Sequence, residues 1–280
     1  MAAALRDLLD DPSPLVRKAL LEKLRQDEGA GGAFLRSISE GDNRVLAGHA
    51  ARYLRELKLT DPRAEFFDFI QSLNYELETG SLLLCRVVYP DIDIGRHCGF
   101  LDEVAARVRE IMLPPMSARE QCRALNRVLF HEYGFRANAE AYSDPRNSFI
   151  SEVIRRKRGI PLTLSVLYIL VAQRCRLNLE PVGLPGHFLV GCFADATPFF
   201  IDPFSGGAFR SPEEVFTLLR RRKIPPKLTH LAPMPVREVL SRNCRNLAHQ
   251  YLAAEQPNLS RLFARFVDEF EATYRRHAES

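Results

Sequence analysis

The stretch LPGHFLVGCFADATPFFIDPF, residues 184–204, places one histidine and one aspartate inside otherwise apolar runs. The two runs are rich in β-branched and aromatic residues, and the short turn ADATP separates them, a pattern typical of an antiparallel hairpin. If Phe193 pairs with Pro198 across this turn, His187 and Asp202 lie within one diagonal step of each other. At that separation a carboxylate can accept a hydrogen bond from an imidazole ring. The stretch therefore predicts a His–Asp pair on a small sheet.

A long apolar segment precedes the hairpin. Pro161 suits the first turn of a helix, and residues 162–174 are apolar nearly all round. Because a helix without a polar face has to be buried, this segment predicts a central helix. LEPVGL, residues 179–184, predicts a further strand between this helix and the hairpin.

The polar loop YSDPRNSFI, residues 142–150, leads toward the central helix. It is followed by SFISEVIRRKRG, residues 148–159, which predicts a short helix that ends at Gly159. Asn147 or Ser148 is a natural N-cap for that helix. The loop is therefore interpreted as a capping segment, with a binding role as the alternative.

The composition is that of a globular protein. The chain has 280 residues, of which 46% are hydrophobic and 26% are charged, with a formal net charge of +4. The longest apolar stretch, residues 162–172, is too short to span a bilayer, and the N-terminus lacks the basic-then-apolar pattern of a secretory signal. We therefore expect a cytoplasmic protein that does not contact membranes.

Two basic runs, RRKR at 155–158 and RRRK at 220–223, could contact phosphate groups. Cations are also common in the last turn of a helix, where they suit the helix dipole. The second interpretation is favoured, because the remaining basic residues are interleaved with acidic ones. A nucleic-acid partner is therefore not expected.

The six cysteines form no C-x-x-C pair and have no histidine at ligand spacing. This pattern argues against both a disulfide framework and a zinc site. We therefore expect neither a metal nor another cofactor, and we interpret the cysteines as small buried hydrophobic residues.

Residues 1–60 carry two similar segments, 15–27 and 45–57. A polar turn, DPSP or EGDN, precedes each, and the pattern predicts two successive helical hairpins. The shared apolar stripe consists of Leu15, Leu20, Leu21 and Leu24 in the first segment and of Val45, Ala50, Ala51 and Leu54 in the second. LLDDPSPLVRKALLEKL, residues 8–24, resembles a HEAT-type repeat, and a plain helical cap is the alternative.

Helical periodicity continues over residues 61–115, which we expect to pack on the core. The double proline at 114–115 marks a boundary, and the core is expected over residues 116–232. A proline-rich joint at 225–235 leads into a C-terminal helical extension, residues 233–280.

Three phrases resemble the bacterial SirB-type proteins of the transglutaminase-like superfamily, whose core also occurs fused to an F-box in some eukaryotic proteins. They are YSDPRNSFISEVIRRKRGIPLTLSVLYILVA from residue 142, VGLPGHFLV from residue 182 and FFIDPFSGG from residue 199. The resemblance covers about residues 80–230.

This resemblance implies an α+β fold: a transglutaminase-like, or papain-like, core with a small antiparallel sheet and a buried central helix, flanked by helical segments. It matches His187 and Asp202 to the histidine and aspartate of the superfamily's catalytic triad. It also implies that residues 233–280 are the start of tetratricopeptide-like repeats.

The third member of the triad is missing. By the same resemblance, the nucleophilic cysteine should fall at residues 160–164, which read IPLTL. Thr163 is the only side-chain nucleophile in that window, and Ser165 lies one step outside it. Cys192 lies five positions after His187 on the predicted strand, and this odd offset should place the two side chains on opposite faces.

Three functions are compatible with these residues. The favoured one is a non-catalytic module that binds a protein or peptide and has a regulatory role. The second is an acyl-transfer enzyme, a protease or amidase, that uses Thr163 or Ser165 with His187 and Asp202. The third is a structural helical scaffold. The position of the Thr163 hydroxyl relative to His187 discriminates between the enzyme and the other two.

Overall fold

A computed structural model describes residues 2–11, 13–26, 28–41, 43–57, 61–113, 115–194 and 197–278. The chain divides into two compact units, Met1–Glu65 and Phe66–Ser280. Parts of four predicted features lie outside the described residues, namely the turns DPSP, EGDN and ADATP and the double proline at 114–115. Of the helices that the structure describes, none combines the length and the apolar character needed to cross a bilayer.

The first unit is helical. The predicted helices at 15–27 and 45–57 are present as α2 and α4, and Leu20, Leu24 and Leu54 are buried between the helices of this unit. Leu15 and Val45, the first members of the two apolar stripes, are exposed. Five positions separate Leu15 from Leu20, which is about 140° around a helix of 3.6 residues per turn. The helices are α1 (Ala2–Leu8), α2 (Pro14–Gln26), α3 (Glu28–Ser39) and α4 (Arg44–Glu56).

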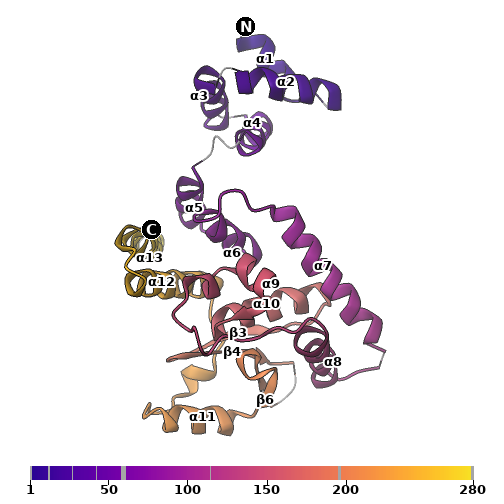
Figure 1. Cartoon of the computed structure of the whole chain (residues 1–280), viewed down its shortest axis with the longest axis vertical. Coiled ribbons are helices and arrows are strands. Elements are labelled where there is room, and N and C mark those ends of the chain that lie inside the picture. Colours follow the sequence, from indigo (N-terminus) through magenta and orange to yellow (C-terminus); the bar gives the residue numbers. More distant parts are fainter. Residues whose placement is uncertain are drawn as a thin grey trace. The chain divides into compact units, whose positions relative to one another are not determined.

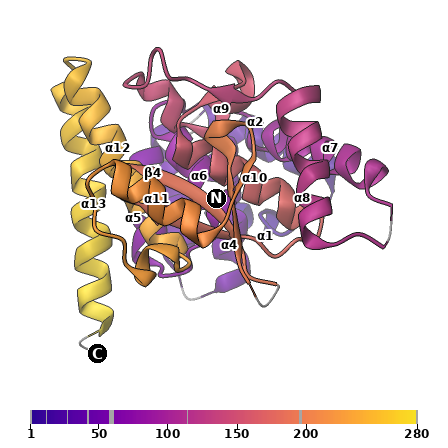
Figure 2. The same cartoon turned by 90° about the horizontal axis from the view of Figure 1, so that it is seen from below.

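The second unit contains the remaining elements, except that α5 (Pro62–Gln71) begins in the first unit and continues into the second. Its longer helices are α5, α6 (Leu77–Arg86), α7 (Ile94–Ile111), α8 (Ala118–Asn126), α9 (Ile150–Arg156), α10 (Pro161–Arg174), α11 (Pro212–Arg221), α12 (Val236–Ala253) and α13 (Pro257–Ala278). Shorter helical turns are η1 (Arg127–Glu132), η2 (Pro145–Ser148), η3 (Pro203–Ser205) and η4 (Leu228–Leu231). Figure 2 shows α12 and α13 lying side by side, in agreement with their extensive contacts.

The strands form two sheets. β3 (Glu180–Leu184), β4 (His187–Cys192), β5 (Phe199–Asp202) and β6 (Ala208–Arg210) make an antiparallel sheet in chain order. β1 (Arg136–Ala137) and β2 (Arg158–Gly159) form a short parallel pair, and β2 immediately precedes α10. The small antiparallel sheet with flanking helices is the α+β arrangement that the sequence predicts.

The central helix is confirmed, because every residue of α10 from Pro161 to Ala172 is buried. Phe188, Val190 and Ile201 of the sheet belong to the core around α10. The opposite face of the sheet packs against α11 through a separate cluster that includes Val182, Leu189, Phe200, Val215 and Leu219. The sheet therefore lies between α10 and α11 (Figure 1).

The predicted hairpin register is also confirmed. Cys192 pairs with Phe199 and Val190 pairs with Ile201, which is the alignment expected from pairing Phe193 with Pro198. In this register Asp202 follows Ile201 at the end of β5 and lies diagonally across from His187 at the start of β4. Strand alternation alone thus brings the two titratable groups to one face of the sheet.

The predicted end of the short helix was wrong. α9 ends at Arg156, and Lys157 takes the left-handed conformation, with φ of 58°, that was expected of Gly159. Gly159 lies instead in β2, where a Cβ atom would meet Thr163 Oγ1 at 3.1 Å and Val153 Cγ2 at 3.1 Å. The glycine is needed there for close packing against α10 rather than for its backbone freedom.

Candidate functional site

His187 and Asp202 contact each other at one end of the antiparallel sheet. His187 follows the turn Pro185–Gly186, in which Gly186 has φ of 70°, and its backbone pairs with Leu184. Its Nε2 atom lies 3.1 Å from Oδ2 of Asp202, although the ring is not aligned for a hydrogen bond. Both residues are buried, with exposed fractions of 6% and 1%. Two titratable groups are therefore in contact inside the fold.

Asp202 has further partners in the turn η3. Its Oδ1 accepts a hydrogen bond from the Ser205 backbone N–H at 3.2 Å, and its Oδ2 accepts one from the Ser205 hydroxyl at 2.8 Å. Arg210 Nη2 lies 4.0 Å from the same Oδ2 atom. Burial raises the pKa of Asp202, but His187 and Ser205 together lower it by more, so the net pKa is below its ordinary value. The carboxylate is consequently ionised at neutral pH and able to orient the imidazole.

An arginine of α12 binds the turn that carries His187. Arg242 Nη2 donates to the carbonyl oxygens of Leu184 at 2.6 Å and of His187 at 2.8 Å. The His187 ring also meets the edge of Phe204 at a centroid distance of 6.2 Å, and Phe204 meets Tyr142 at 6.2 Å. His187, Phe204 and Tyr142 therefore form a row of rings.

This row leads toward the start of α10. η3 contacts both α10 and β1, and β1 pairs with β2, the strand that leads directly into α10. The structure thus brings the His–Asp pair to the same end of the central helix as Thr163. The hydroxyl of Thr163, however, donates to the carbonyl oxygen of Asn147 at 2.6 Å and accepts from the Ile160 backbone N–H at 3.3 Å. Thr163 therefore caps the helix and makes no hydrogen bond to His187 within the described part of the chain.

Ser165, the second predicted nucleophile, is fully buried at 0% exposure. Its Oγ atom has no hydrogen-bond partner among the residues that the structure describes. No described residue is therefore hydrogen-bonded to this hydroxyl as a base. A general base has to lie within about 2.6–3.2 Å of the atom that it deprotonates, or act through one water.

The loop that holds Thr163 is itself anchored by a buried polar network. Asn147 accepts from Asn138 Nδ2 at 2.9 Å and donates to Ala141 O at 2.6 Å. Ser148 Oγ donates to Gln250 Oε1 at 2.7 Å. The capping role expected of Asn147 or Ser148 was wrong, because the N-cap of α9 is Phe149. Asn147 instead bonds to the preceding loop, and Ser148 bonds to α12.

Sequence analysis missed the partners of this network on α12. Asn243 Nδ2 donates to Ser148 O at 2.9 Å, and Gln250 accepts from the hydroxyl of the same residue. Asn243 and Gln250 are seven positions apart and share one helix face. A polar pair at that spacing among apolar neighbours was the signal available in the sequence.

A cavity of about 330 Å³ opens beside this network. Ile160, the residue immediately before α10, lines it together with Tyr142, the last ring of the row. The other lining residues are Ser143, Asn246, His249, Gln250 and Ala253. We call this cavity the α10 cleft. Its lining offers hydroxyl, amide and imidazole groups and an aromatic ring, with no carboxylate, lysine or arginine.

Five of the six cysteines have raised pKa values. Burial raises the pKa of Cys85 and Cys98 to about 11 and that of Cys122 to about 12. Burial raises the pKa of Cys175 and Cys244 as well. These five thiols are therefore poor sources of thiolate at neutral pH.

Cys192 lies on β4 with His187, but its side chain belongs to the core around α10. By strand alternation His187 points to the other face, as the sequence predicts. Within the described ranges, no group of three or more histidine, cysteine, aspartate or glutamate residues could hold a metal ion.

Comparison with known proteins places these residues in a family. The family model of the transglutaminase-like superfamily matches residues 96–245, a range that includes Thr163, Ser165, His187 and Asp202. No solved structure matches the chain.

Curated relatives were found in bacteria and in mammals. The UPF0162 protein of Xylella fastidiosa (strain 9a5c) is 34% identical over 190 residues, which cover 62% of this chain and 64% of that protein. The UPF0162 protein of Vibrio cholerae serotype O1 is 29% identical over 136 residues, or 47% of this chain and 49% of that protein. F-box only protein 21 of Mus musculus is 39% identical over 67 residues, or 24% of this chain and 11% of that protein. The matched regions thus span less than two thirds of each relative.

Proposed function

The chain belongs to the transglutaminase-like superfamily, and we propose that it is a non-catalytic member whose α10 cleft binds an extended segment of a partner protein. One observation carries this proposal. The Thr163 hydroxyl, within the window 160–164 in which the resemblance places the superfamily's nucleophile, is committed to the carbonyl oxygen of Asn147, while His187 and Asp202 contact each other.

The chemistry around His187 argues against acyl transfer. Neither Thr163 nor Ser165 has its hydroxyl bonded to the imidazole among the described residues. A hydroxyl also gains far less than a thiol from a position at a helix N-terminus, because its pKa is many units higher. The five thiols with raised pKa values do not substitute for it.

The α10 cleft has the chemistry of a peptide site. Tyr142 is 45% exposed and offers a flat apolar surface to a side chain. Asn246 is half-buried, and no described residue bonds its amide, which can donate to and accept from a peptide backbone. A lining without charged groups suits neutral amides better than phosphates or carboxylates. The cleft is therefore matched to an extended neutral peptide.

The first basic run, residues 155–158, also argues against a nucleic-acid partner. Arg155 pairs with Glu152 at 2.6 Å, and Arg156 pairs with Asp144 at 3.1 Å. Lys157 Nζ lies over the Phe100 ring at 4.0 Å. Because Arg155 and Arg156 are paired within the fold, the run does not present the continuous row of free cations that a nucleic-acid backbone requires.

A first experiment tests for catalysis. The full chain is treated with a fluorophosphonate and with iodoacetamide, and adducts are located by mass spectrometry. We expect no adduct on Thr163 or Ser165, and slow cysteine alkylation that is unchanged in His187→Ala. An adduct on either hydroxyl that disappears in His187→Ala would establish the acyl-transfer enzyme instead.

A second experiment tests for binding. A display library of short unstructured peptides is selected on the full chain, and Kd values of enriched peptides are measured by fluorescence anisotropy. Tyr142→Ala and Asn246→Ala should each weaken binding by about tenfold. Tyr274→Ala, at a tyrosine on α13 that is 51% exposed, is the matched control and should change nothing. If no peptide is enriched, or if all three variants weaken binding equally, a structural scaffold becomes the better explanation.

A further inference from the structure

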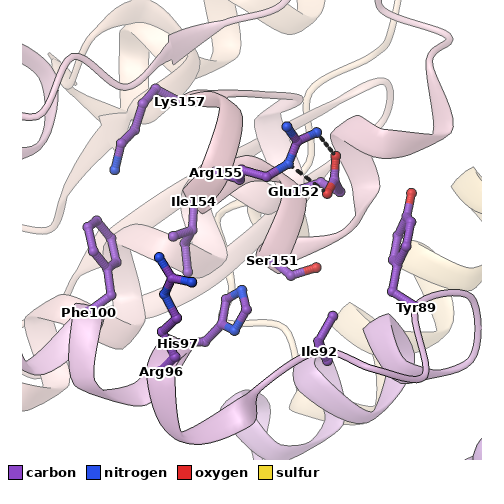
Figure 3. A pocket seen from close by; sticks show the side chains of 10 residues that line it. All are labelled: Tyr89, Ile92, Arg96, His97, Phe100, Ser151, Glu152, Ile154, Arg155 and Lys157. Carbon is purple, nitrogen blue, oxygen red and sulfur yellow. Dashed lines mark hydrogen bonds and ion pairs between the residues drawn. The ribbon is translucent and has the colours of Figure 1, made fainter.

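A second cavity, of about 470 Å³, lies between α7 and α9 (Figure 3). It shares no lining residue with the α10 cleft. Its volume lies in the range of about 300–1,000 Å³ that is typical of small-molecule sites. We call it the α7–α9 cavity.

Two cations face this cavity without a carboxylate partner. Arg96 is exposed, and no described residue forms an ion pair or hydrogen bond with its guanidinium. Lys157 Nζ lies 4.0 Å from the Phe100 ring centroid and 4.3 Å from that of Phe135, and no described carboxylate lies within ion-pair distance of it. Burial lowers the pKa of Lys157, and the more distant charge of Glu103 offsets only part of this effect. In Figure 3 both side chains point into the cavity.

The acidic group of the cavity is already neutralised. Glu152 accepts two hydrogen bonds from Arg155, at 3.0 Å from Nε and 2.6 Å from Nη2. His97 has its Nδ1 atom bonded to the carbonyl oxygen of Asp93 at 2.7 Å, which leaves Nε2 available. The uncompensated charge in the cavity is therefore positive and comes from Arg96 and Lys157.

A buried hydroxyl in the cavity also lacks an oxygen or nitrogen partner. Ser151 is 4% exposed, and its Oγ atom has no aligned hydrogen bond among the described residues, although it interacts with the weakly polar Cys85 thiol. Figure 3 shows this oxygen pointing into the space between α9 and the segment that carries Tyr89 and Ile92. A buried polar group without a partner is costly to the fold, and a bound ligand could supply the missing bond.

The rest of the lining is apolar. Tyr89, Ile92, Phe100 and Ile154 form its walls. The Tyr89 ring is braced edge-on by Phe149 at a centroid distance of 5.2 Å, which fixes its orientation. A flat apolar group fits such walls, whereas a free inorganic ion would leave them unused.

We propose that the α7–α9 cavity binds a small organic phosphate. The phosphate lies between Arg96 and Lys157, the flat body packs against Tyr89 and Ile92, and a polar group of that body bonds to Ser151. Two unpaired cations match the charge of a phosphate monoester better than that of a carboxylate.

The proposal is tested by isothermal titration of the full chain with phenyl phosphate, adenosine 5′-monophosphate, benzoate and inorganic phosphate. At least one of the two phosphate esters should bind about tenfold more tightly than both benzoate and inorganic phosphate. Saturation by inorganic phosphate with the same affinity would reduce the cavity to a simple anion site and overturn the proposal. So would the absence of binding by either ester.

Variants locate the ligand. Arg96→Ala and Lys157→Gln should each weaken ester binding by about tenfold, and Ser151→Ala by a few-fold. Arg220→Ala removes one positive charge from an exposed position on α11 and should leave Kd unchanged. Thermal melts of each variant establish that it is folded, and Arg96 is exposed, so its loss should not affect the fold. An equal loss of affinity in Arg220→Ala would overturn the proposal, because it would mean that only net charge matters.

Discussion

The Ser148 hydroxyl donates to Gln250 Oε1 across 102 positions of sequence, at 2.7 Å and in the interior of the fold. The bond joins the loop that holds Thr163 to α12, which lines the α10 cleft. A buried pair of this kind is expected to matter for stability mainly when one partner is removed, because the other is then left unsatisfied.

Removing the side chain of only one partner should lower the stability of the fold. Ser148→Ala and Gln250→Ala are each expected to lower the free energy of unfolding by about 1–3 kcal/mol. The double variant should lose less than the sum, with a coupling of about 0.5–1.5 kcal/mol. Urea denaturation of the four proteins measures this cycle. Additive losses would mean that the two side chains do not interact.

Thr163 should behave as a structural residue. Thr163→Val keeps the shape of the side chain but removes the bond to Asn147 O, and should lower the free energy of unfolding by about 1–2 kcal/mol. Thr163→Ser, the matched control, retains the hydroxyl and should lose less. Urea denaturation followed by circular dichroism measures both. Equal losses in the two variants would show that the methyl group, not the hydroxyl, carries the effect.

The Asp202 carboxylate should make stability depend on pH. Its folded pKa is lowered, from an unfolded value of about 3.9. Its contribution is therefore fully present above the unfolded value and disappears as the pH falls through the folded one. The difference in unfolding free energy between wild type and Asp202→Asn should be largest near neutral pH and shrink below about pH 4.

The matched control for that comparison is Asp268→Asn, which changes an exposed aspartate on α13. Unfolding free energies of the three proteins from acidic to neutral pH provide the measurement. A difference between wild type and Asp202→Asn that grows as the pH falls would contradict the lowered pKa. An equal pH dependence in the Asp268→Asn variant would assign the effect to net charge.

Gly159 should not tolerate a side chain. An alanine Cβ would lie 3.1 Å from both Thr163 Oγ1 and Val153 Cγ2, so Gly159→Ala should destabilise the protein by about 1–3 kcal/mol. Gly99→Ala in α7 is the control, because nothing lies within 4 Å of its added Cβ. That change should stabilise the helix by about 0.5–1 kcal/mol. Thermal unfolding of both variants compares them, and a stabilised Gly159→Ala protein would refute the packing argument.

Short-range patterns in the sequence were sufficient to predict that His187 and Asp202 lie close together. The alternation of HFLVGCF and FFIDPF, and the length of the turn between them, determine the pairing of Cys192 with Phe199 and hence the approach of His187 to Asp202. The buried helix over 161–174 follows in the same way from the absence of a polar face. Such features depend on neighbours within a few residues, so periodicity reveals them.

The end of α9 was not predictable in that way. Glycine is the usual residue for a left-handed helix end, but Lys157 takes that conformation, and the backbone at Gly159 instead approaches Thr163 and Val153. The rings of Phe100 and Phe135 cover the Lys157 side chain and hold it in place. Long-range packing thus overrides a local preference.

The sequence by itself determined the buried helix, the hairpin and the proximity of His187 to Asp202, because each depends on spacing along one short segment. Only the tertiary structure decided that the Thr163 hydroxyl bonds to Asn147 and that Arg96 and Lys157 meet in one cavity. The partners in these contacts come from separate elements. Their distance is set by how α7, α9 and α10 pack together, and no pattern within any one of those segments carries that information.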